Sequence, residues 1–391
     1  MFFRNDLKAL ADKVRVKVFQ ECSPEVDLIV TTDPTHVGYV AGYRSVMYDV
    51  DRTFRSAAVF TRDMVILVTG AADAAPGLEV VQDPSRIYRY GIFYVSYSGS
   101  GAKYATMPKP KNSFGDALHA AIQSVVKPHQ IVGFDCANEW EQQQVKALLA
   151  GRSVDVRPAI LRARSVKLFE EIEKMRYVAS ITEKGMEKAF SQAEEGVTEL
   201  ELSTMISSEI IAGGGIPRFV VVTTGERSAL ADAYATNAKL KRGDLVRVDV
   251  GCTVDGYWAD TARTAVVGEA TTLQQERYDA LDKGELAQLE IARAGIKAGD
   301  LFEIAVNNVR TGALPDYQRT HCGHGLGLGA HEFPTLNVAN RDVDIVEGMV
   351  LCVETPLYEM GWGGMMVEDI IVIKKGGNER LTKLPRDLRV L

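Results

Sequence analysis

Residues 243–268 read GDLVRVDVGCTVDGYWADTARTAVVG, two apolar, β-rich runs separated by a short polar break. The runs cover Leu245–Cys252 and Tyr257–Val267, and the break contains the pair Asp255-Gly256. An Asp-Gly pair between two such runs is a strong short-range signal for a β-hairpin. The sequence therefore predicts two paired antiparallel strands at this point of the chain.

The hairpin also predicts where two carboxylates lie. If both residues of the Asp-Gly pair form the loop, Asp249 pairs with Ala262, and Asp260 lies two positions away on the same face. If the loop begins one residue earlier, Asp249 and Asp260 stand directly opposite each other. Both registers place the two carboxylates on one face, about 4.5–8 Å apart. A three-residue loop would separate them, so the prediction depends on the turn.

A second pair of acidic residues follows the same plan near the end of the chain. The runs VLCVET (350–355) and MVEDIIVI (366–373) flank the Gly-rich stretch 360–364. A loop centred on Gly361 would place Glu354 and Glu368 opposite each other. Strand alternation puts Cys352 on the same face as Glu354.

Four acidic groups that point inward from apolar strands carry a high cost unless a counter-charge is present. Two divalent cations would supply +4 against −4, with neutral His324 as a fifth ligand. Oxygen-rich ligation with one imidazole suits Mn²⁺, Fe²⁺, Co²⁺ or Zn²⁺ without choosing among them. The alternative is that each carboxylate caps a turn or forms an ordinary ion pair. Arg247, Arg263 and Lys374 are close enough in sequence to supply such partners.

The pattern of strand-like and helix-like segments divides the chain into two regions. Residues 1–160 alternate short strands with helices, which predicts a smaller α/β domain. Pro158 interrupts that pattern, and a long helix is expected from Lys167. Residues 161–391 then combine helices with apolar runs joined by Gly-containing turns. We expect an α+β domain there, with a curved, mostly antiparallel sheet and helices on its outer face.

Composition excludes several classes of protein. With 45 Lys and Arg against 52 Asp and Glu, the net charge is −7, which gives nucleic acid no reason to bind. The five cysteines are scattered and contain no CxxC pair, which favours free thiols in a reducing compartment. No stretch resembles a signal peptide or a membrane span. We therefore expect a cytoplasmic protein without membrane or nucleic-acid partners.

Several longer stretches carry a resemblance to a known family. They are GDLVRVDVG, DGYWADTARTAVVG, HCGHGLGLGAHEFP, VEGMVLCVETPLY and GGMMVEDIIVI in the second region, and TDPTHVGYVAGYRS (32–45) and LRARSVKLFEEIEKMR (161–176) before it. In order and spacing the chain resembles the creatinase, prolidase and aminopeptidase P family of "pita-bread" metallopeptidases. The resemblance covers almost the whole chain and implies a creatinase-type N-terminal domain, a pita-bread catalytic domain and a homodimer.

The resemblance also implies a role for each candidate residue. Asp249 would chelate one of two metal ions, Asp260 and Glu368 would bridge both, and His324 and Glu354 would complete one shell. Glu354 would take the proton of the attacking metal-bridging water. His331 matches the substrate-side histidine of the family, whereas His321 is one residue away from another usual histidine position, here Thr320, and is interpreted as structural.

Two departures from the family pattern lie on the substrate side. Asp232 stands where peptidases of the family usually carry a histidine, and Met366 stands where they often carry an arginine. Both changes remove positive character. An anionic Asp232 would repel a substrate carboxylate and attract an amine, although it could equally be solvated or paired with Arg227.

The leading hypothesis is a dinuclear metal hydrolase of Xaa-Pro dipeptides or short peptides. Asp232 and Met366 favour an alternative within the same scaffold: a hydrolase of small amidines or amides, or a metal-dependent lyase. A second alternative is an inactive binding protein.

Overall fold

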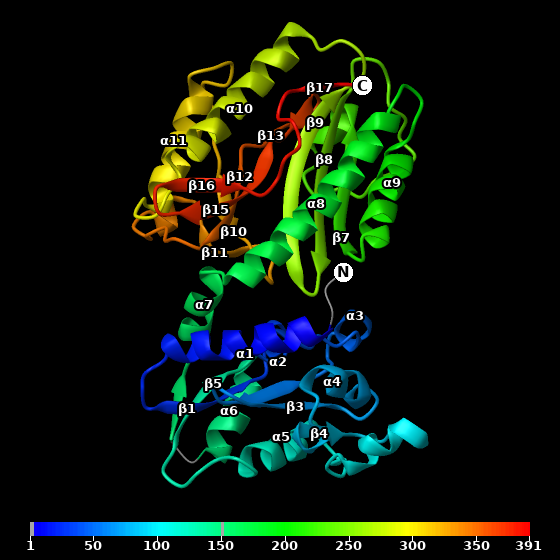
Figure 1. Ribbon diagram of the computed structural model, residues 1–391. Helices are drawn as coiled ribbons and strands as arrows, with labels where there is room; N and C mark the ends of the chain where they lie inside the picture. The colour runs from blue at the N-terminus through cyan, green and yellow to red at the C-terminus, as the bar shows by residue number, and fades with distance from the viewer. Residues whose placement is uncertain (1–3, 150–151) are drawn as a thin grey trace. The chain divides into compact units, whose positions relative to one another are not determined.

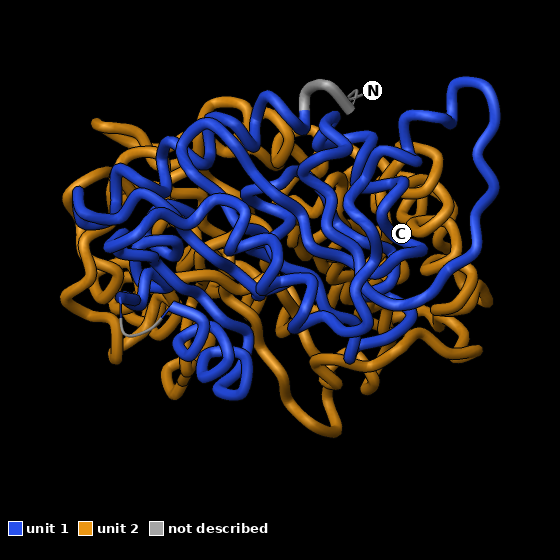
Figure 2. Tube along the Cα trace, turned by 90° about the horizontal axis from the view of Figure 1, so that it is seen from below, with its two compact units in different colours: residues 1–164 blue, residues 165–391 orange. Residues whose placement is uncertain are grey.

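The protein is described by a computed structural model covering residues 4–149 and 152–391. Residues 1–3 and 150–151 fall within the predicted N-terminal domain and lie outside the described residues. The chain forms two compact units, residues 1–164 and 165–391, which Figure 2 colours separately. The expected division after residue 160 lies four positions before this boundary.

The first unit contains a mixed six-stranded sheet in the order β4-β3-β2-β1-β5-β6. The pairs β1–β5, β3–β4 and β5–β6 are parallel, and β1–β2 and β2–β3 are antiparallel. Its strands are β1 (Val26–Thr31), β2 (Ala57–Phe60), β3 (Val65–Gly70), β4 (Ile87–Tyr90), β5 (Ile131–Asp135) and β6 (Ser153–Asp155). Its helices are α1 (Arg4–Gln20), α2 (Pro34–Ala41), α3 (Met47–Val50), α4 (Ala74–Val81), α5 (Phe114–Gln123) and α6 (Glu139–Leu148), with 3₁₀ turns at Pro84–Arg86 and Gly99–Thr106.

The segment around Pro158 differs from the expectation. Pro158 does not open an irregular joint, because Arg157–Ser165 is itself the helix α7, ahead of α8 (Phe169–Gln192). Proline is tolerated in the first turn of a helix, where its missing N–H has no intrahelical partner to lose. A proline near a helix start therefore marked a beginning rather than an interruption.

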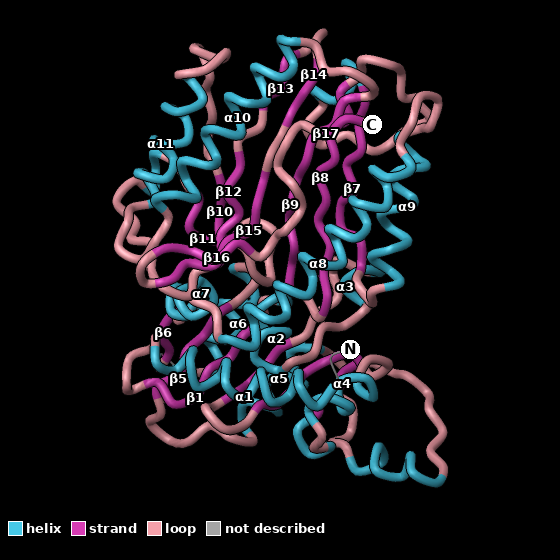
Figure 3. The backbone as a smooth tube through the Cα atoms, turned by 45° about the horizontal axis from the view of Figure 1, so that its top comes forward, coloured by secondary structure: helices cyan, strands magenta, loops and turns pink. Residues whose placement is uncertain are grey.

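The second unit is built on a nine-stranded sheet with the central order β11-β10-β12-β15-β9-β8-β7. All neighbours pair antiparallel except β17, which runs parallel to β9. Figures 1 and 3 show the strands of this sheet. The strands are β7 (Ile216–Thr224), β8 (Leu245–Val254), β9 (Tyr257–Val266), β10 (Gly323–Gly325), β11 (Glu332–Thr335), β12 (Val350–Glu354), β15 (Glu368–Lys374), β16 (Gly377–Arg380) and β17 (Arg389–Val390). A separate two-stranded ribbon joins β13 (Leu357–Glu359) to β14 (Gly363–Met365).

Four helices pack on this sheet. They are α8, α9 (Glu199–Ala212), α10 (Thr272–Ile291) and α11 (Ala298–Arg310), with 3₁₀ turns at Gly225–Ala229 and Val338–Asn340. Helices α8 and α9 contact strands β7 to β9, while α10 contacts β12 and β16 and is paired with α11. No helix among residues 4–149 and 152–391 has the length and apolar composition of a membrane span. The antiparallel pairing and these helix contacts confirm the prediction of an antiparallel sheet covered by helices.

The turn between β8 and β9 determines how the sheet presents its acidic side chains. Asp255 and Gly256 both adopt positive φ, 53° and 86°, as a two-residue hairpin loop with the favoured twist requires. Lys174 of α8 reaches the turn, with its Nζ 2.6 Å from Asp255 Oδ2. The turn residues thus set the strand register and are themselves held by a helix.

We expect Gly256→Ala to destabilise the protein by about 1 kcal/mol or more, because a side chain at positive φ is strained. Gly376→Ala is the matched control, since that glycine sits in a turn without positive φ and has open space for a Cβ. Chemical unfolding of both variants gives the comparison. An equal loss of unfolding free energy in the two variants would show that the left-handed geometry of the β8–β9 turn does not contribute to stability.

Candidate metal centre

The β8–β9 hairpin adopts the first of the two predicted registers. Val254 pairs with Tyr257, so Asp255-Gly256 is the loop and Asp249 lies opposite Ala262. Asp260 lies opposite Gly251, two positions from Ala262. Both carboxylates therefore stand on one face, as the sequence predicted.

The second acidic pair is directly opposed. Glu354 on β12 pairs with Glu368 on β15, and Glu368 in turn pairs with Ala262 on β9. The connection between β12 and β15 is the β13–β14 ribbon, with Gly361 at its tip, rather than a simple loop. Asp249, Ala262, Glu368 and Glu354 thus form one row across four adjacent strands. We call this the acidic row.

The acidic row faces away from helix α8. On β8, Cys252 Sγ lies 3.0 Å from the hydroxyl of Thr182, a residue of α8. On β9, the hydroxyl of Tyr257 donates to Glu171 of the same helix over 3.1 Å. Since side chains alternate along a strand, Asp249 and Asp260 point to the opposite face.

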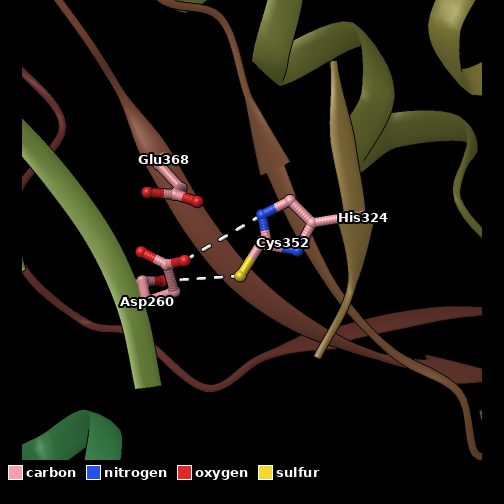
Figure 4. Close-up of side chains that lie close together, drawn as sticks. All are labelled: Asp260, His324, Cys352 and Glu368. Carbon is pink, nitrogen blue, oxygen red and sulfur yellow. Dashed lines mark hydrogen bonds and ion pairs between the residues drawn. The ribbon is translucent and has the colours of Figure 1, made fainter. Parts of the chain in front are cut away.

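Four side chains converge at the centre of this face (Figure 4). Asp260, His324, Cys352 and Glu368 are all buried, and one potential ligand atom from each lies within 4.8 Å of the others. His324 Nε2 is 3.9 Å from Asp260 Oδ2. Two donors bound to one transition metal at roughly 2.0–2.3 Å are at most about 4.6 Å apart, so the 4.8 Å spread of the cluster is close to the size of a metal shell.

The two glycines beside His324 explain how its strand fits. A Cβ on Gly323 would meet Cys352 O at 2.3 Å, and one on Gly325 would meet Phe333 O at 2.5 Å. Only glycine allows β10 to pass this closely between β11 and β12. His324 Nδ1 lies 3.1 Å from the Gly325 carbonyl, to which its N–H can donate, leaving Nε2 free to face the carboxylates.

The electrostatics of the site are those of crowded, buried carboxylates. Burial and the nearby charge of Glu354 raise the pKa of Asp249 to about 7, although Arg247 opposes the shift. Burial, with the charges of neighbouring acidic residues, raises the pKa of Asp260 and Glu368 well above the usual range. Burial lowers the pKa of His324 to about 4, so its imidazole is neutral near pH 7. The fold therefore crowds carboxyl groups where their ionised forms are unfavourable unless a cation is bound beside them.

Ordinary ion pairs do not satisfy most of this charge. Of the three basic residues considered from the sequence, Arg263 pairs with Asp369 and Lys374 pairs with Glu379. Of the three, only Arg247 forms an ion pair with a carboxylate of the acidic row, with its Nη1 3.3 Å from Asp249 Oδ2. Across residues 4–149 and 152–391, no lysine or arginine forms an ion pair with Asp260, Glu354 or Glu368. The simple ion-pair alternative therefore accounts for one carboxylate of the four.

The predicted substrate-side residues lie around this cluster. The His331 ring stacks on His324 with centroids 3.9 Å apart, and it is itself exposed. Asp232 is also exposed, and its charge acts on both Asp249 and His331. Met366 is buried beside the row, with the Tyr358 hydroxyl 3.8 Å from its sulfur.

Two residues, one in the cluster and one beside Glu354, were not predicted from the sequence to take part in the site. Cys352 was placed on the correct face but not considered as a ligand, and its Sγ lies 3.5 Å from the main-chain oxygen of Asp260. His321, interpreted as structural, has its Nδ1 2.9 Å from Glu354 Oε1. The sequence did contain one signal for His321, the concentration of histidines in a short segment: three of the six histidines of the chain fall within residues 321–331.

The donor set fits a divalent transition metal. It combines carboxylate oxygens, one neutral imidazole and one thiol, all on regular strands. Glu368 Oε2 is buried and, within the described part of the chain, has no hydrogen-bond partner. Buried polar atoms are almost always satisfied, so an unpartnered carboxylate oxygen at the centre of such a cluster is what a cation site requires.

Comparisons of sequence place these residues in a known context. The model of metallopeptidase family M24 matches residues 173–375, which include every candidate ligand. A putative dipeptidase, YkvY of Bacillus subtilis, is 31% identical over 252 residues, covering 64% of this chain and 69% of that protein. The Xaa-Pro dipeptidase of Pyrococcus furiosus is 33% identical over 227 residues, covering 58% and 65%. The chain thus aligns with roughly two thirds of the length of these relatives.

Comparisons of structure extend over the whole chain. An X-Pro aminopeptidase from Thermotoga maritima MSB8 has a TM-score of 0.78 at 21% identity, with 97% of this chain and 99% of that one covered. The prolidase of Pyrococcus furiosus has a TM-score of 0.74 at 24% identity, with 95% and 100% covered. At these identities the likeness concerns the fold alone. It confirms the prediction of a pita-bread domain after a creatinase-type α/β domain.

The raised pKa of Asp249 predicts how the stability of metal-free protein depends on pH. An unfolded aspartate ionises near pH 4, whereas folded Asp249 ionises only near pH 7, so between these values the folded state holds the extra proton. Its contribution to stability is therefore complete below pH 4 and is lost as pH rises to 7.

In chelator, we expect the unfolding free energy of the native sequence to fall relative to that of Asp249→Asn by about 1 kcal/mol per pH unit across this window. Denaturant titrations at pH 4.5, 5.5 and 6.5 measure the difference. Parallel pH profiles for the two proteins would contradict a raised pKa at Asp249.

Proposed function

The chain belongs to metallopeptidase family M24 and is therefore a metallohydrolase, and we propose that it is a dinuclear Xaa-Pro dipeptidase or aminopeptidase acting on short peptides. The observation that carries the proposal is that the acidic row, together with Asp260 and His324, brings five potential ligands from five separate strands around one buried, acidic centre. The proposed ligands are Asp249, Asp260, His324, Glu354 and Glu368. Manganese, iron, cobalt and zinc all suit this donor set.

Divalent ions held there would lower the pKa of a coordinated water towards neutrality and polarise the carbonyl of the scissile amide. Their charge also offsets the repulsion that the carboxylates otherwise maintain. Asp260 and Glu368, at the centre of the cluster, would hold the ions there. Asp249 and Glu354 flank them on either side of the row.

Glu354 is suited to accept a proton. Burial alone would raise its pKa, but the adjacent His321, with His324 and Arg319, more than compensates, so the pKa lies below its ordinary value. Glu354 is therefore ionised at neutral pH, beside the imidazole of His321. We assign His321 the role of orienting this carboxylate.

His331 and Asp232 are suited to hold the substrate. Partial desolvation of its ring, which stacks on His324, lowers the pKa of His331, so near pH 7 it is a neutral imidazole that can donate a hydrogen bond to the scissile group. Asp232 is exposed at the rim and is negatively charged, which suits the free amino end of a peptide. Met366 contributes no charge to the substrate side.

The proposal includes the compartment and the assembly. The five cysteines are free, which agrees with a reducing environment, and we place the protein in the cytoplasm. We also propose a homodimer, on the resemblance to the creatinase, prolidase and aminopeptidase P family.

The proposed activity is tested with Xaa-Pro dipeptides and Xaa-Pro tripeptides in added Mn²⁺, Co²⁺ or Zn²⁺. We expect turnover that falls by about 10²–10⁴-fold in Glu354→Gln, because the proton acceptor is lost. The control is Glu359→Gln, an exposed carboxylate on β13 paired with Arg277, which should keep full activity.

The other outcomes separate the alternatives. Two bound metals without turnover of any Xaa-Pro peptide would favour a small amidine or amide hydrolase or a lyase, to which Asp232 and Met366 already point. A protein that binds no metal would favour a binding role.

Asp232→Asn tests the substrate orientation. We expect KM to rise by roughly 2- to 5-fold for peptides with a free amino end, the size of an exposed ion pair. Peptides with an acetylated amino end should show no such change. An equal effect on both substrates would remove Asp232 from amine recognition.

A further inference from the structure

Arg247 and Met366 occupy the same row of the sheet, next to the acidic row. Arg247 on β8 pairs with Thr264 on β9. The Thr264 hydroxyl accepts from Met366 N over 2.8 Å and donates to Met366 O over 3.0 Å, just ahead of β15. Arg247 therefore neighbours Asp249 along its strand in the way that Met366 neighbours Glu368.

The side chains of Arg247 and Met366 also share a neighbour. The Arg247 guanidinium lies 5.3 Å from the centre of the Tyr358 ring. The hydroxyl of the same tyrosine lies 3.8 Å from Met366 Sδ. Since Arg247 is two residues from Asp249 on one strand, it points to the same face of the sheet. Arg319 also lies near this ring, with its guanidinium 5.7 Å from the ring centre, but of the two arginines only Arg247 forms an ion pair with Asp249.

Arg247 is fully buried, and each of its three guanidinium nitrogens makes at least one hydrogen bond. Nη1 lies 3.3 Å from Asp249 Oδ2. Its other donors bind the carbonyls of one loop: Ser228 O at 2.9 Å, Leu230 O at 2.7 Å and Ala231 O at 2.7 Å. That loop leads directly into Asp232. One side chain therefore joins a proposed metal ligand to the backbone that carries a proposed substrate residue.

We propose that Arg247 is a positioning residue that orients the Asp249 carboxylate and fixes the 228–231 loop, supplying from β8 the positive charge that position 366 lacks on β15. The inference rests on the proposed metal site. A buried arginine with this many acceptors is rigid, and a carboxylate that loses such a partner is left with an uncompensated charge. The bonds from Arg247 to the 228–231 loop fix the position of the backbone just before Asp232. Arg247 therefore affects both metal affinity and substrate binding.

The test removes the arginine from position 247 on β8 and places one at position 366, just ahead of β15. We compare Arg247→Met, Met366→Arg and the double variant by isothermal titration with Mn²⁺ and with Zn²⁺. Arg247→Met is expected to weaken metal binding by about 10- to 100-fold, as loss of an outer partner of a metal ligand commonly does. The double variant is expected to recover most of that affinity, because the charge returns to the same row.

The kinetic readout separates the two roles of Arg247. An arginine at position 366 supplies charge but does not replace the three bonds to the 228–231 loop. In the double variant we therefore expect kcat at saturating metal to recover while KM stays raised. Full recovery of both parameters would remove the loop from the proposal.

Arg263→Met is the matched control, since Arg263 is a buried arginine on β9 whose charge pairs with Asp369 and which touches the acidic row only through the main-chain oxygens of Ala262 and Glu368. It should lower the unfolding temperature, and Met366→Arg should not rescue it. If Arg247→Met does not fold, Arg247→Lys keeps the charge and should show intermediate metal affinity.

Native metal affinity in Arg247→Met, or a double variant no better than Arg247→Met, would overturn the role of Arg247. Metal binding without turnover of Xaa-Pro peptides would instead overturn the proposed function, while the affinity comparison would still judge Arg247.

Discussion

The repulsion among buried carboxylates is the constraint on which the rest of this structure depends. Asp260 and Glu368 lie at most 5% exposed, beside Glu354, on strands whose other residues are largely apolar. Such an arrangement costs free energy in an isolated chain, because charges are removed from water without compensating partners. The fold maintains it through rigid elements: a two-residue turn, directly paired strands, and glycines that admit β10. A bound pair of cations would convert this cost into binding energy.

The remainder of the site is arranged around that negative centre. The imidazole of His324 stays neutral, so it adds a ligand without adding charge. His321 and Arg247 stand at the two ends of the acidic row, each beside one flanking carboxylate. Both partners thus stand at the edges of the row and not at its centre. This distribution is expected if the central carboxylates bind metal ions and not basic side chains of the protein.

Much of this arrangement could be predicted from local sequence. The Asp-Gly turn and strand alternation together place Asp249 and Asp260 on one face, and the same logic places Glu354 opposite Glu368. These features depend on residues close in sequence, where turn geometry and side-chain alternation determine the outcome. The helices on the sheet were also predicted, because their periodicity is local.

What could not be predicted depends on pairing between distant segments. Cys352 enters the cluster because it lies directly opposite His324 across the β10–β12 pair, 28 positions away in sequence. His321 reaches Glu354 through the same non-local pairing, and Arg247 meets the 228–231 loop only once that loop folds beside β8. Alternation predicts which face of a strand a side chain occupies but not which strand lies beside it, so these contacts need the assembled sheet.

The most direct measurement of the central claim is the metal content of the purified protein after equilibration with manganese, cobalt or zinc. The account predicts two ions per chain in the native protein and fewer in Asp260→Asn and Glu368→Gln, and a native protein that retains none would contradict it.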